Sequence, residues 1–386
     1  MNLELTPEQQ LIRDTARDFA TRELEPHAAE WDERATFPRE MFNKMAELGF
    51  AGMLVPEEYG GVGADTLSYI LMLEELNRVV PALGTVISVH NSLACGALRI
   101  YGNEEQRARY LPLLASGEWL GAYALSEAHA GSNPAAMRAT AVRRGDVYVI
   151  NGTKTWITSG GTGEMSILFA VTGNTDKPSR NISAFVCPKD TPGLTVSKPE
   201  HKMGIRASET VQLIFEDAEL PAENLLGEEG EGFKIAMSLL DGGRIGIAAQ
   251  GVGIAQRAFE EATSYSLERE QFGGPISDHQ AIQFMLADMA MGLSAARLLL
   301  YRAATMRDKG LKVSKEASMA KLFASELAMK SAWAAVQIHG GYGYVKEYPV
   351  ERFFRDAKIT EIYEGTSQIQ RIVIASNVLK EHAGRA

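Results

Sequence analysis

Apolar and polar residues begin to alternate at Ala141-Val142-Arg143-Arg144-Gly145-Asp146-Val147-Tyr148-Val149-Ile150, and Asn151-Gly152 and Lys154-Thr155-Trp156-Ile157-Thr158 follow. A period of two predicts β-strands, because successive side chains of a strand point to opposite faces. Asn-Gly is a favoured pair for a tight hairpin turn. The stretch therefore predicts β-ribbons joined by tight turns, in a chain whose flanking segments have a helical period.

The β block extends on either side of this stretch. Three more strands fit residues 166–171, 182–187 and 210–215, and Pro192-Gly193 supplies one of the turns between them. We expect residues 121–228 to form a compact, barrel-like β domain.

The first 120 residues have the period of helices. They open with Thr6-Pro7-Glu8-Gln9, which combines a hydroxyl cap, a proline in the first turn and a glutamine at the capping-box position. Gly49, Gly102 and Gly117 are suitable helix terminators. We expect an α-helical domain over residues 1–120, with further helices at 39–48, 66–79, 86–101 and 104–115.

Long helices return after residue 228. The expected helices cover residues 233–269, 279–307, 314–338 and 367–380, and turns at Phe272-Gly273-Gly274-Pro275 and Lys309-Gly310 separate the first three. A helix of about 29 residues is about 43 Å long, which suits a four-helix bundle. Residues 229–386 are therefore expected to form a bundle domain, and the fold class is α+β with several domains.

Composition excludes several classes of protein. The formal net charge is −10 and no segment has a sustained basic face, so we expect no nucleic-acid partner. Cys95 and Cys187 are far apart and outside any CxxC pattern, which indicates reduced, buried thiols rather than disulfides or a metal site. No uninterrupted apolar stretch approaches membrane-spanning length and no basic leader precedes an apolar one, so we expect no membrane partner and a cytosolic protein.

An acidic residue lies between an aromatic residue and a glycine in Tyr363-Glu364-Gly365-Thr366-Ser367-Gln368. Ser367 can cap the helix that follows, with Gln370 completing a capping box. Glu364 then lies just outside a helix N-terminus, where the helix dipole favours a carboxylate. Two interpretations follow: a structural acid that complements the dipole, or a catalytic base.

Other motifs are spread along the chain. They are Tyr123-Ala124-Leu125-Ser126-Glu127 with Gly131-Ser132, Trp156-Ile157-Thr158, Asp241-Gly242-Gly243-Arg244, Arg269 with Gln271-Phe272-Gly273, His279-Gln280, Gln337-Ile338-His339-Gly340-Gly341, and residues 362–371. Each motif is weak alone. In this order the set resembles the acyl-CoA dehydrogenase family across essentially the whole chain, and most strongly its short-chain, butyryl-type members.

The resemblance implies an FAD between the β domain and the bundle. Trp156 and Thr158 would contact the isoalloxazine ring, and Thr158 or Ser126 would donate hydrogen bonds toward its N5/O4 edge. The alternatives are a β-domain core aromatic for Trp156 and a strand residue of high β-propensity for Thr158. The implied contacts on this side are Tyr123, Leu125, Ser126, Gly131, Ser132, Trp156, Ile157, Thr158, Thr366 and Gln368.

A second set of residues would serve the FAD of a neighbouring subunit. By resemblance they contact its adenosine half, with Arg269 binding the pyrophosphate, and a homo-oligomer, tetrameric in the family, is implied. The alternative for Gly340-Gly341 is a helix C-cap and turn. The set comprises Arg269, Phe272, Gln280, Gln337, Ile338, Gly340 and Gly341.

The resemblance also places an acyl-CoA substrate. Asp241 and Arg244 are three residues apart on a helix, so they form either a surface ion pair or, by resemblance, a contact with the CoA part near the base. The loop around Ser132 departs from the common family pattern at Ala128, His129 and Asn133, and we assign His129 no catalytic role. The implied substrate contacts are Ser132, Asp241, Arg244, Tyr363 and Gly365.

The implied reaction converts an acyl-CoA to a trans-2-enoyl-CoA. Glu364 would take the α-proton while the β-hydride passes to flavin N5, the thioester oxygen being polarised by the N–H of Glu364 and a ribitol hydroxyl, and electrons would pass to an electron-transfer flavoprotein. Desolvation by substrate would raise the pKa of Glu364. Branches with the base on the bundle helix are disfavoured by Gly243, and dicarboxylyl substrates by Gly84, where their branch has arginine.

Several alternatives stay open. Short- to medium-chain straight acyl groups are expected, but branched short ones remain, as does a flavin oxidase on the same fold. Relatives that accept nitroalkanes use an aspartate base, against which Glu364 argues. A non-catalytic flavin-binding scaffold is the rival of another class. The expected location is the bacterial cytoplasm, or the mitochondrial matrix for a processed eukaryotic form.

Overall fold

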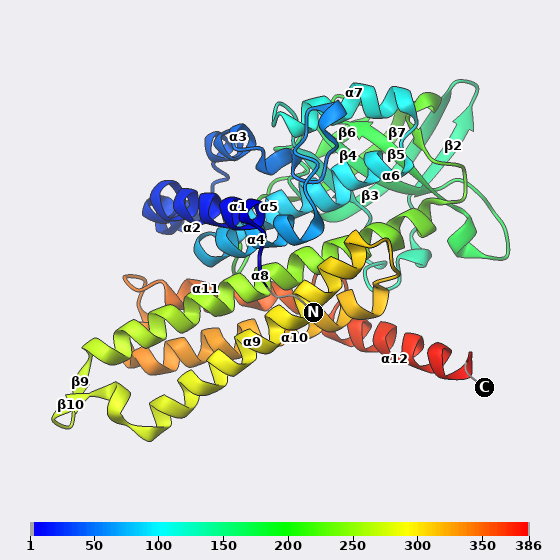
Figure 1. Cartoon of the computed structure of the whole chain (residues 1–386). Coiled ribbons are helices and arrows are strands. Elements are labelled where there is room, and N and C mark those ends of the chain that lie inside the picture. The colour runs from blue at the N-terminus through cyan, green and yellow to red at the C-terminus, as the bar shows by residue number, and fades with distance from the viewer. Residues whose placement is uncertain (1–3, 385–386) are drawn as a thin grey trace.

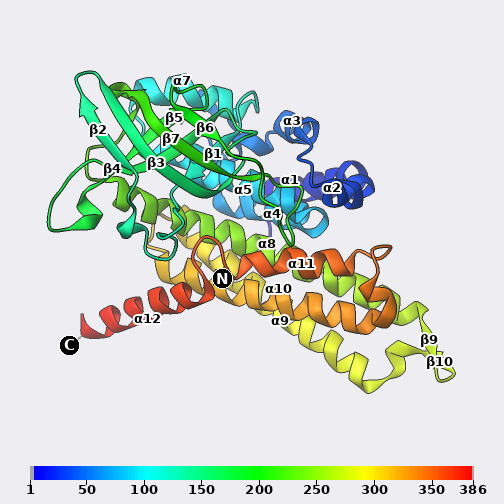
Figure 2. The same ribbon diagram turned by 180° about the vertical axis from the view of Figure 1, so that it is seen from behind.

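The computed structural model describes residues 4–384, in which helical, β and helical regions follow one another along the chain. The N-terminal helices and the β domain lie side by side over the long bundle helices (Figures 1 and 2). The first region contains α1 (Pro7–Phe19), α2 (Ala28–Arg34), α3 (Arg39–Glu47), α4 (Thr66–Val79), α5 (Pro81–Ser88), α6 (Gly96–Tyr101) and α7 (Glu104–Ala115).

The start of α1 confirms its prediction. The Thr6 hydroxyl accepts a hydrogen bond from the N–H of Gln9, and the Gln9 side chain accepts one from the N–H of Thr6, so both halves of the capping box are present. The helix expected at residues 86–101 is longer and irregular. It begins at Pro81, whose missing N–H suits a first turn, and passes through a π-helical segment at Val89–Cys95.

The strands of the middle region form one sheet in the order β6-β7-β3-β2-β4-β5-β8, with β1 parallel to β4. Strands β1, β6 and β8 and the second half of β7 were not predicted. The strands are β1 (Gly121–Ala124), β2 (Thr140–Arg144), β3 (Val147–Thr158), β4 (Met165–Val171), β5 (Ile182–Pro188), β6 (Leu194–Val196), β7 (Thr210–Pro221) and β8 (Leu225–Leu226).

The turn expected at Asn151-Gly152 is wrong. Strand β3 runs through this pair, and its pairing with β7 has an irregularity between Ile150 and Gly152. Gly152 has φ +139°, and a Cβ on it would lie 2.7 Å from Ala139. The pair therefore forms a bulge, which lets the backbone at Ala139 approach closely. Glycine is common at such positions in strands.

The bundle region follows β8. It contains α8 (Gly232–Glu268), the hairpin of β9 (Glu270–Gln271) and β10 (Gly274–Pro275), α9 (Gln280–Asp308), α10 (Ser314–His339), α11 (Val350–Thr360) and α12 (Ser367–Ala383). Helix α11 was not predicted. In both views α12 extends away from the other helices, and only Ser367 and Gln370 of it are buried (Figures 1 and 2).

The cap expected for α12 is also wrong. Thr366, not Ser367, is the N-cap: its backbone is extended, and its side chain accepts from the N–H of Ile369 at 3.3 Å. Ser367 already lies in the helix. Gln370 closes no capping box, because its amide donates instead to the carbonyl oxygens of Glu364 and Gly365.

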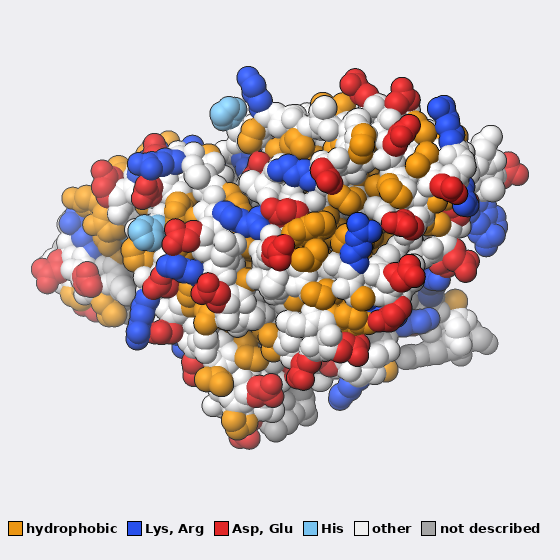
Figure 3. Space-filling model, turned by 90° about the horizontal axis from the view of Figure 1, so that it is seen from above, with side chains coloured by type: hydrophobic (Ala, Val, Ile, Leu, Met, Phe, Trp, Pro, Cys, Tyr) orange, Lys and Arg blue, Asp and Glu red, His pale blue; other side chains and the backbone are white. Residues whose placement is uncertain are grey.

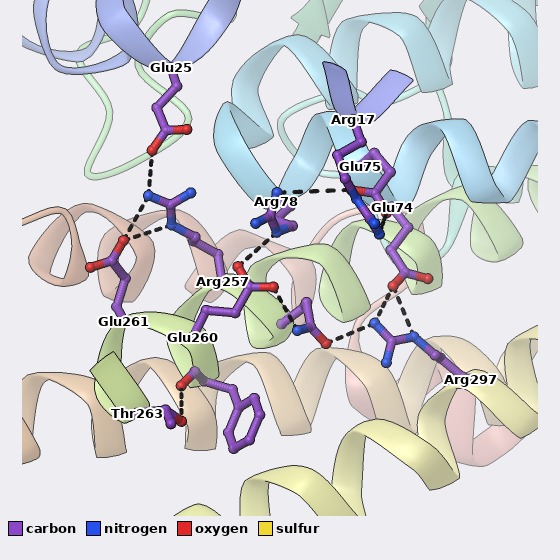
Figure 4. A network of polar contacts seen from close by, with 12 residues as sticks. Arg17, Glu25, Glu74, Glu75, Arg78, Arg257, Glu260, Glu261, Thr263 and Arg297 are labelled. Atoms are coloured by element: carbon purple, nitrogen blue, oxygen red, sulfur yellow. Dashed lines mark hydrogen bonds and ion pairs between the residues drawn. The ribbon is translucent and has the colours of Figure 1, made fainter. Parts of the chain in front are cut away.

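Helix α8 joins the regions, since it packs against both α4 and α10. Paired charges line its contact with the N-terminal helices (Figure 4). Arg78 of α4 binds Glu260 of α8 at 2.8 Å, and Glu75 of α4 binds Arg17 of α1 at 2.6 Å. Most of these side chains are partly or fully buried, so the pairing avoids uncompensated charge in the interface.

The remaining surface has two characters. On the face in Figure 3, acidic and basic side chains are interspersed with single hydrophobic ones. Helix α9, in contrast, exposes Phe284, Met291 and Leu298 at intervals of seven residues, which places them on one stripe. Within the described residues α9 is also the one helix long and apolar enough to cross a membrane, although Asp288 and Arg297 interrupt it.

Candidate active site

The turn between α11 and α12 carries Glu364 in an unusual backbone conformation. Glu364 and Gly365 have φ values of +50° and +95°, and positive φ is strained for a glutamate. A Cβ on Gly365 would lie 2.6 Å from the side-chain nitrogen of Gln370, so glycine fits this position. Gln370 donates to the Gly365 carbonyl at 2.8 Å, and Lys321 of α10 donates to the same oxygen at 2.7 Å.

The carboxylate of Glu364 lies against Gly243 of α8. A Cβ on Gly243 would overlap its Oε2 atom. Glu364 as a whole is partly exposed, but both carboxylate oxygens are buried and have no hydrogen-bond partner among the described residues. Burial raises the pKa of Glu364 to about 7, against the opposing effects of Lys321 and Arg244. A carboxyl group whose pKa lies near 7 is suited to general-base catalysis at neutral pH.

Aromatic side chains surround this carboxylate. Tyr69 of α4, Tyr123 of β1 and Tyr363 all interact electrostatically with Glu364, and burial raises the pKa of each hydroxyl, so each stays neutral. The Tyr363 hydroxyl bonds to Gln250 of α8, whose amide donates to Thr85 at 2.8 Å. The base therefore has neutral hydroxyls as neighbours, one of which, that of Tyr363, belongs to a hydrogen-bonded group with Gln250 and Thr85.

Asp241 and Arg244 form the expected i,i+3 ion pair, at 2.7 Å. The pair is not on the open surface, because Arg244 is only 5% exposed. Burial raises the pKa of Asp241, and Arg244 opposes this. Helix α8 thus places a buried cation directly after Gly243 in the sequence, with its carboxylate partner three residues earlier, and Arg244 acts electrostatically on Glu364.

Two segments predicted to contact the cofactor lie next to each other. The Thr155 N–H donates to the Ser126 carbonyl at 2.9 Å, which joins β3 to the segment after β1. Trp156 has φ +63° and is 64% exposed, so its interpretation as a core aromatic is wrong. Ile157 points the other way into the sheet core, which leaves only its backbone for a cofactor contact; Thr158 is partly exposed.

Sequence reasoning missed a buried ion pair beneath these segments. Lys154 is fully buried and lies 2.8 Å from Glu127, and it also donates to the Leu125 carbonyl at 3.1 Å. Glu127 accepts from the backbone N–H groups of Arg138 and Ala139. Although burial raises the pKa of Glu127, Lys154 and these donors bring it below its ordinary value. The available signal was a charged residue at the end of one motif, Glu127, and another two residues before Trp156, Lys154.

The pair therefore anchors the loop that carries Gly131 and Ser132. Both residues are exposed, as are Ala128, His129 and Asn133. His129 lies 3.5 Å from Glu127. An exposed loop on a buried support leaves Ser132 accessible to a ligand.

The second predicted set lies at the end of the bundle. Arg269, Ile338, Gly340 and Gly341 line a cavity of about 640 Å³ together with Tyr265 and other residues. Cβ atoms on either glycine would contact nothing within 4 Å, so the two glycines leave open space. Other members lie outside this lining: Phe272 is 96% exposed at the hairpin tip, and Gln280 and Gln337 are exposed on α9 and α10.

One chain does not bring the two sets together. The β9–β10 hairpin lies at the end of the bundle that is far from the β domain, whereas the α11–α12 turn lies beside the β domain (Figures 1 and 2). The Glu364 set and the Arg269 set are therefore separate surfaces of the chain.

Family models account for nearly the whole chain. Those described as the N-terminal, middle and C-terminal domains of acyl-CoA dehydrogenase match residues 6–118, 122–218 and 230–379. The chain belongs to the acyl-CoA dehydrogenase family. It is an enzyme of this family, so the alternative of a non-catalytic scaffold is set aside.

Curated relatives of this acyl-CoA dehydrogenase match over nearly their full length. An acyl-CoA dehydrogenase of Bacillus subtilis is 50% identical over 98% of this chain and 99% of its own. A short-chain specific acyl-CoA dehydrogenase of Clostridium acetobutylicum is 48% identical, with 98% and 100% covered. An acryloyl-CoA reductase (NADH) of Anaerotignum propionicum is also 48% identical, with 98% and 96% covered.

Solved structures share the fold closely. Butyryl-CoA dehydrogenase from Megasphaera elsdenii is 43% identical with a TM-score of 0.96, covering 98% of this chain and 100% of its own. A chain from a study of the electron transferring flavoprotein of Acidaminococcus fermentans is 49% identical with a TM-score of 0.97, with the same coverage. A Mycobacterium smegmatis glutaryl-CoA dehydrogenase in complex with FADH2 is 33% identical with a TM-score of 0.92, covering 97% and 95%.

Proposed function

We propose that this enzyme oxidises short straight-chain acyl-CoA thioesters to trans-2-enoyl-CoA, with Glu364 as the base. The observation that carries the proposal is the Glu364 carboxylate, which is buried, has no hydrogen-bond partner within residues 4–384 and lies over Gly243. A structural acid at a helix N-terminus would instead bond the free N–H groups of α12, and Thr366 fills that role. Glu364 is thus left available for a proton.

The residues present fit an FAD. On the β side the Thr155 hydroxyl is buried and has no hydrogen-bond partner in the described part of the chain, and Trp156 is held on the surface by strained backbone. We propose contacts from Tyr123, Leu125, Ser126, Gly131, Ser132, Trp156, the backbone of Ile157, Thr158, Thr366 and Gln368. When bound, FAD supplies the acceptor for the hydride that leaves the substrate β-carbon.

The chain itself handles the proton. The α-C–H bond breaks as Glu364 takes its proton, the hydride leaves the β-carbon, and the two carbons form a double bond. The Glu364 N–H polarises the thioester oxygen, while Ser132, Asp241, Arg244, Tyr363 and Gly365 orient the acyl-CoA. Substrate binding excludes water and keeps the pKa of Glu364 in the range where it can accept the proton.

The path of α8 away from the base favours short acyl chains. Gly243, Gly246 and Gln250 follow one another on a face of this helix, and Gln250 lies about 10 Å beyond Gly243 at 1.5 Å per residue. A Cβ on Gly246 would overlap the Ser88 hydroxyl, so α5 closes in at that point. The hydrogen-bonded Gln250, Thr85 and Tyr363 then end the pocket.

The proposed site argues against a dicarboxylyl substrate. Gly84 is buried in α5, and a Cβ there would overlap the buried side chain of Asn77. No space is left at that position for an arginine that would hold a second carboxylate.

We propose that a second copy completes each FAD site. The cavity beside Arg269, Gly340 and Gly341, with Phe272, Gln280, Gln337 and Ile338 near it, would receive the adenosine half of a neighbour's FAD, in a tetramer. The apolar stripe of Phe284, Met291 and Leu298 on α9 supports burial against another copy. Functional domain limits at residues 1–120, 121–228 and 229–386 follow the changes of element type.

The proposed electron acceptor is an electron-transfer flavoprotein, which the similarity to the Acidaminococcus fermentans chain supports. The proposed location is the bacterial cytoplasm, or the mitochondrial matrix for a processed eukaryotic form. A second candidate is reduction of a short enoyl-CoA, which the 48% identity to the acryloyl-CoA reductase favours.

Anaerobic addition of butyryl-CoA to the purified enzyme tests the proposal. We expect the flavin absorbance to bleach, and bleaching by longer or branched thioesters to be weaker. Absence of bound flavin, or no bleaching with any acyl-CoA, would refute it. NADH-dependent loss of an enoyl-CoA distinguishes the second candidate, and oxygen consumption detects an oxidase.

A further inference from the structure

Lys321 of α10 is a buried cation close to the base. It is 0% exposed, and its Nζ donates to the Gly365 carbonyl at 2.7 Å. Among the described residues no carboxylate lies within 4.0 Å of this ammonium group in an ion pair. Its electrostatic neighbours are Glu364, Arg244 and Glu361.

Another lysine shows what a purely structural arrangement looks like. Lys154 is equally buried, but it forms an ion pair with Glu127 at 2.8 Å. Burying an ammonium group without a close counter-charge is unfavourable, and an apolar side chain in its place would ordinarily be tolerated better. The arrangement at Lys321 therefore calls for a role other than stability.

The contact of Lys321 fixes the turn from which the base projects. Its hydrogen bond holds the carbonyl of Gly365, the second of two residues with positive φ. Gln370 of α12 donates to the same carbonyl oxygen, at 2.8 Å. The two donors determine the peptide orientation, and with it the direction in which Glu364 points toward Gly243.

The charge of Lys321 acts on the same group. Two cations face the Glu364 carboxylate: Lys321 from α10 and Arg244 from α8. The other titratable groups that face it are the neutral hydroxyls of Tyr69, Tyr123 and Tyr363. Burial lowers the pKa of Lys321 to about 8, while Glu364 acts to raise it, so the lysine carries its charge at neutral pH.

We propose that Lys321 is a positioning residue for Glu364. Lys321 holds the left-handed turn, and its charge favours the ionised form of the carboxylate in the enzyme without substrate. This inference rests on the proposed role of Glu364 as the base. The base can act only while Lys321 of α10 supplies one hydrogen bond and one positive charge to the turn that carries Glu364.

Three variants of the FAD-bound enzyme test the proposal. Lys321→Met removes both the donor and the charge, whereas Lys321→Gln keeps a donor without the charge. Lys330→Met is the control, because Lys330 lies on the same helix, is 65% exposed in its side chain and forms only a surface ion pair with Asp288. Anaerobic flavin reduction by butyryl-CoA is followed by stopped flow from about pH 6 to about pH 9.

Loss of the ammonium charge should raise the pKa of Glu364. In the pH profile of the flavin-reduction rate, we expect the acid limb to move up by about one pH unit in both Lys321 variants. At pH values below the limb the rate should then be about tenfold lower than in the wild type. The high-pH plateau should fall about tenfold in Lys321→Met and recover toward the wild-type value in Lys321→Gln, because only the latter retains a donor to Gly365. Lys330→Met should match the wild type.

A second measurement separates this inference from the proposed function. The infrared C=O band of the protonated Glu364 carboxyl, identified by its absence in Glu364→Gln, reports the titration without turnover. If the wild type reduces no flavin with any acyl-CoA, the proposed function fails, while a raised Glu364 titration in the Lys321 variants still supports the positioning role.

Two outcomes would overturn the inference. One is an unchanged pH limb and an unchanged carboxyl titration in Lys321→Gln. The other is a loss of FAD content or melting temperature in both Lys321 variants with the Glu364 titration in its wild-type place, which would make Lys321 structural only. Lys321→Gln decides the matter if Lys321→Met does not fold.

Discussion

The carboxylate of Glu364 occupies the volume that a side chain on Gly243 would need. The two residues lie on different elements, 121 positions apart in sequence, and the glycine is what allows the carboxylate to reach this place. The position of the proposed base thus depends on two features: the turn that carries Glu364, and the lack of a side chain at Gly243 of α8.

Gly243→Ala should therefore displace the base. We expect flavin reduction to fall by about 10²-fold, because small misplacements of a catalytic group have effects of this size. FAD content should change little. Gly96→Ala is a matched control, since a Cβ on this helical glycine would have its nearest contact at 3.5 Å. Equal rates in the two variants would contradict the placement of Glu364 against α8.

Glu364→Gln should retain FAD and ligand binding but lose flavin reduction. The amide has nearly the shape of the carboxyl group and cannot accept the α-proton. Binding of enoyl-CoA, followed by the perturbation of the flavin spectrum, serves as the control for an intact site. Reduction at the wild-type rate would show that another group takes the proton.

The same substitution should stabilise the fold near neutral pH. The pKa of Glu364 is raised by burial to about 7 in the folded state, above its ordinary value, so the unfolded chain releases this proton more readily. The stability that the neutral carboxyl contributes is fully present below the ordinary pKa and is lost as pH rises through about 7.

The amide cannot ionise, so it avoids this loss. Glu364→Gln should have the same melting temperature as wild type near pH 4 to 5 and a higher one near pH 8. At pH 8 its free energy of unfolding should exceed that of wild type by about 1–3 kcal/mol. Thermal unfolding at several pH values measures it. A difference that shrinks as pH rises would contradict the raised pKa.

Lys154→Met should destabilise the β domain by about 3 kcal/mol, because it leaves the buried Glu127 without its partner. FAD should also bind more weakly, since the pair anchors the segments that carry Ser126 and Trp156. The double variant with Glu127→Gln should lose less than the sum of the two single variants. Additive losses in thermal unfolding would show that the two charges do not interact.

Sharing of the FAD site between copies predicts complementation. Arg269→Ala should lose cofactor and Glu364→Gln should lose chemistry, so each enzyme alone should be inactive. Coexpressed, the two chains should form hybrids in which a copy with an intact Glu364 receives Arg269 from its neighbour, and flavin reduction should return. No recovery in purified hybrids would place Arg269 and Glu364 in the site of the same copy.

The order of elements and the main helices followed from periodicity and caps, as at Thr6 and Gln9. Errors arose where distant segments decide local structure. Asn151-Gly152 has the sequence of a hairpin turn, but the approach of Ala139 makes it a bulge within β3. Helix α12 is capped by Thr366 rather than Ser367, because Gln370 is drawn to the carbonyls of the Glu364 turn.

The candidate site was predictable only in part. Glu364 could be singled out because its motif is local and precedes a helix. Lys321 could not, because its contact with Gly365 spans 44 positions and nothing in the sequence of α10 distinguishes it from an exposed lysine. Glu127 ends a recognised motif and Lys154 lies two residues before another, but only the fold shows that they are buried against each other.

The separation of the Glu364 set from the Arg269 set has a genetic consequence. In a cell that makes two versions of this chain, a copy without Glu364 would disable only its own site. A copy without Arg269 would withhold the cofactor contact from an intact neighbour. Its own site would stay complete, because the intact neighbour supplies the Arg269 that this site needs. Each kind of allele therefore costs one site per altered copy, but the site that is lost belongs to a different copy.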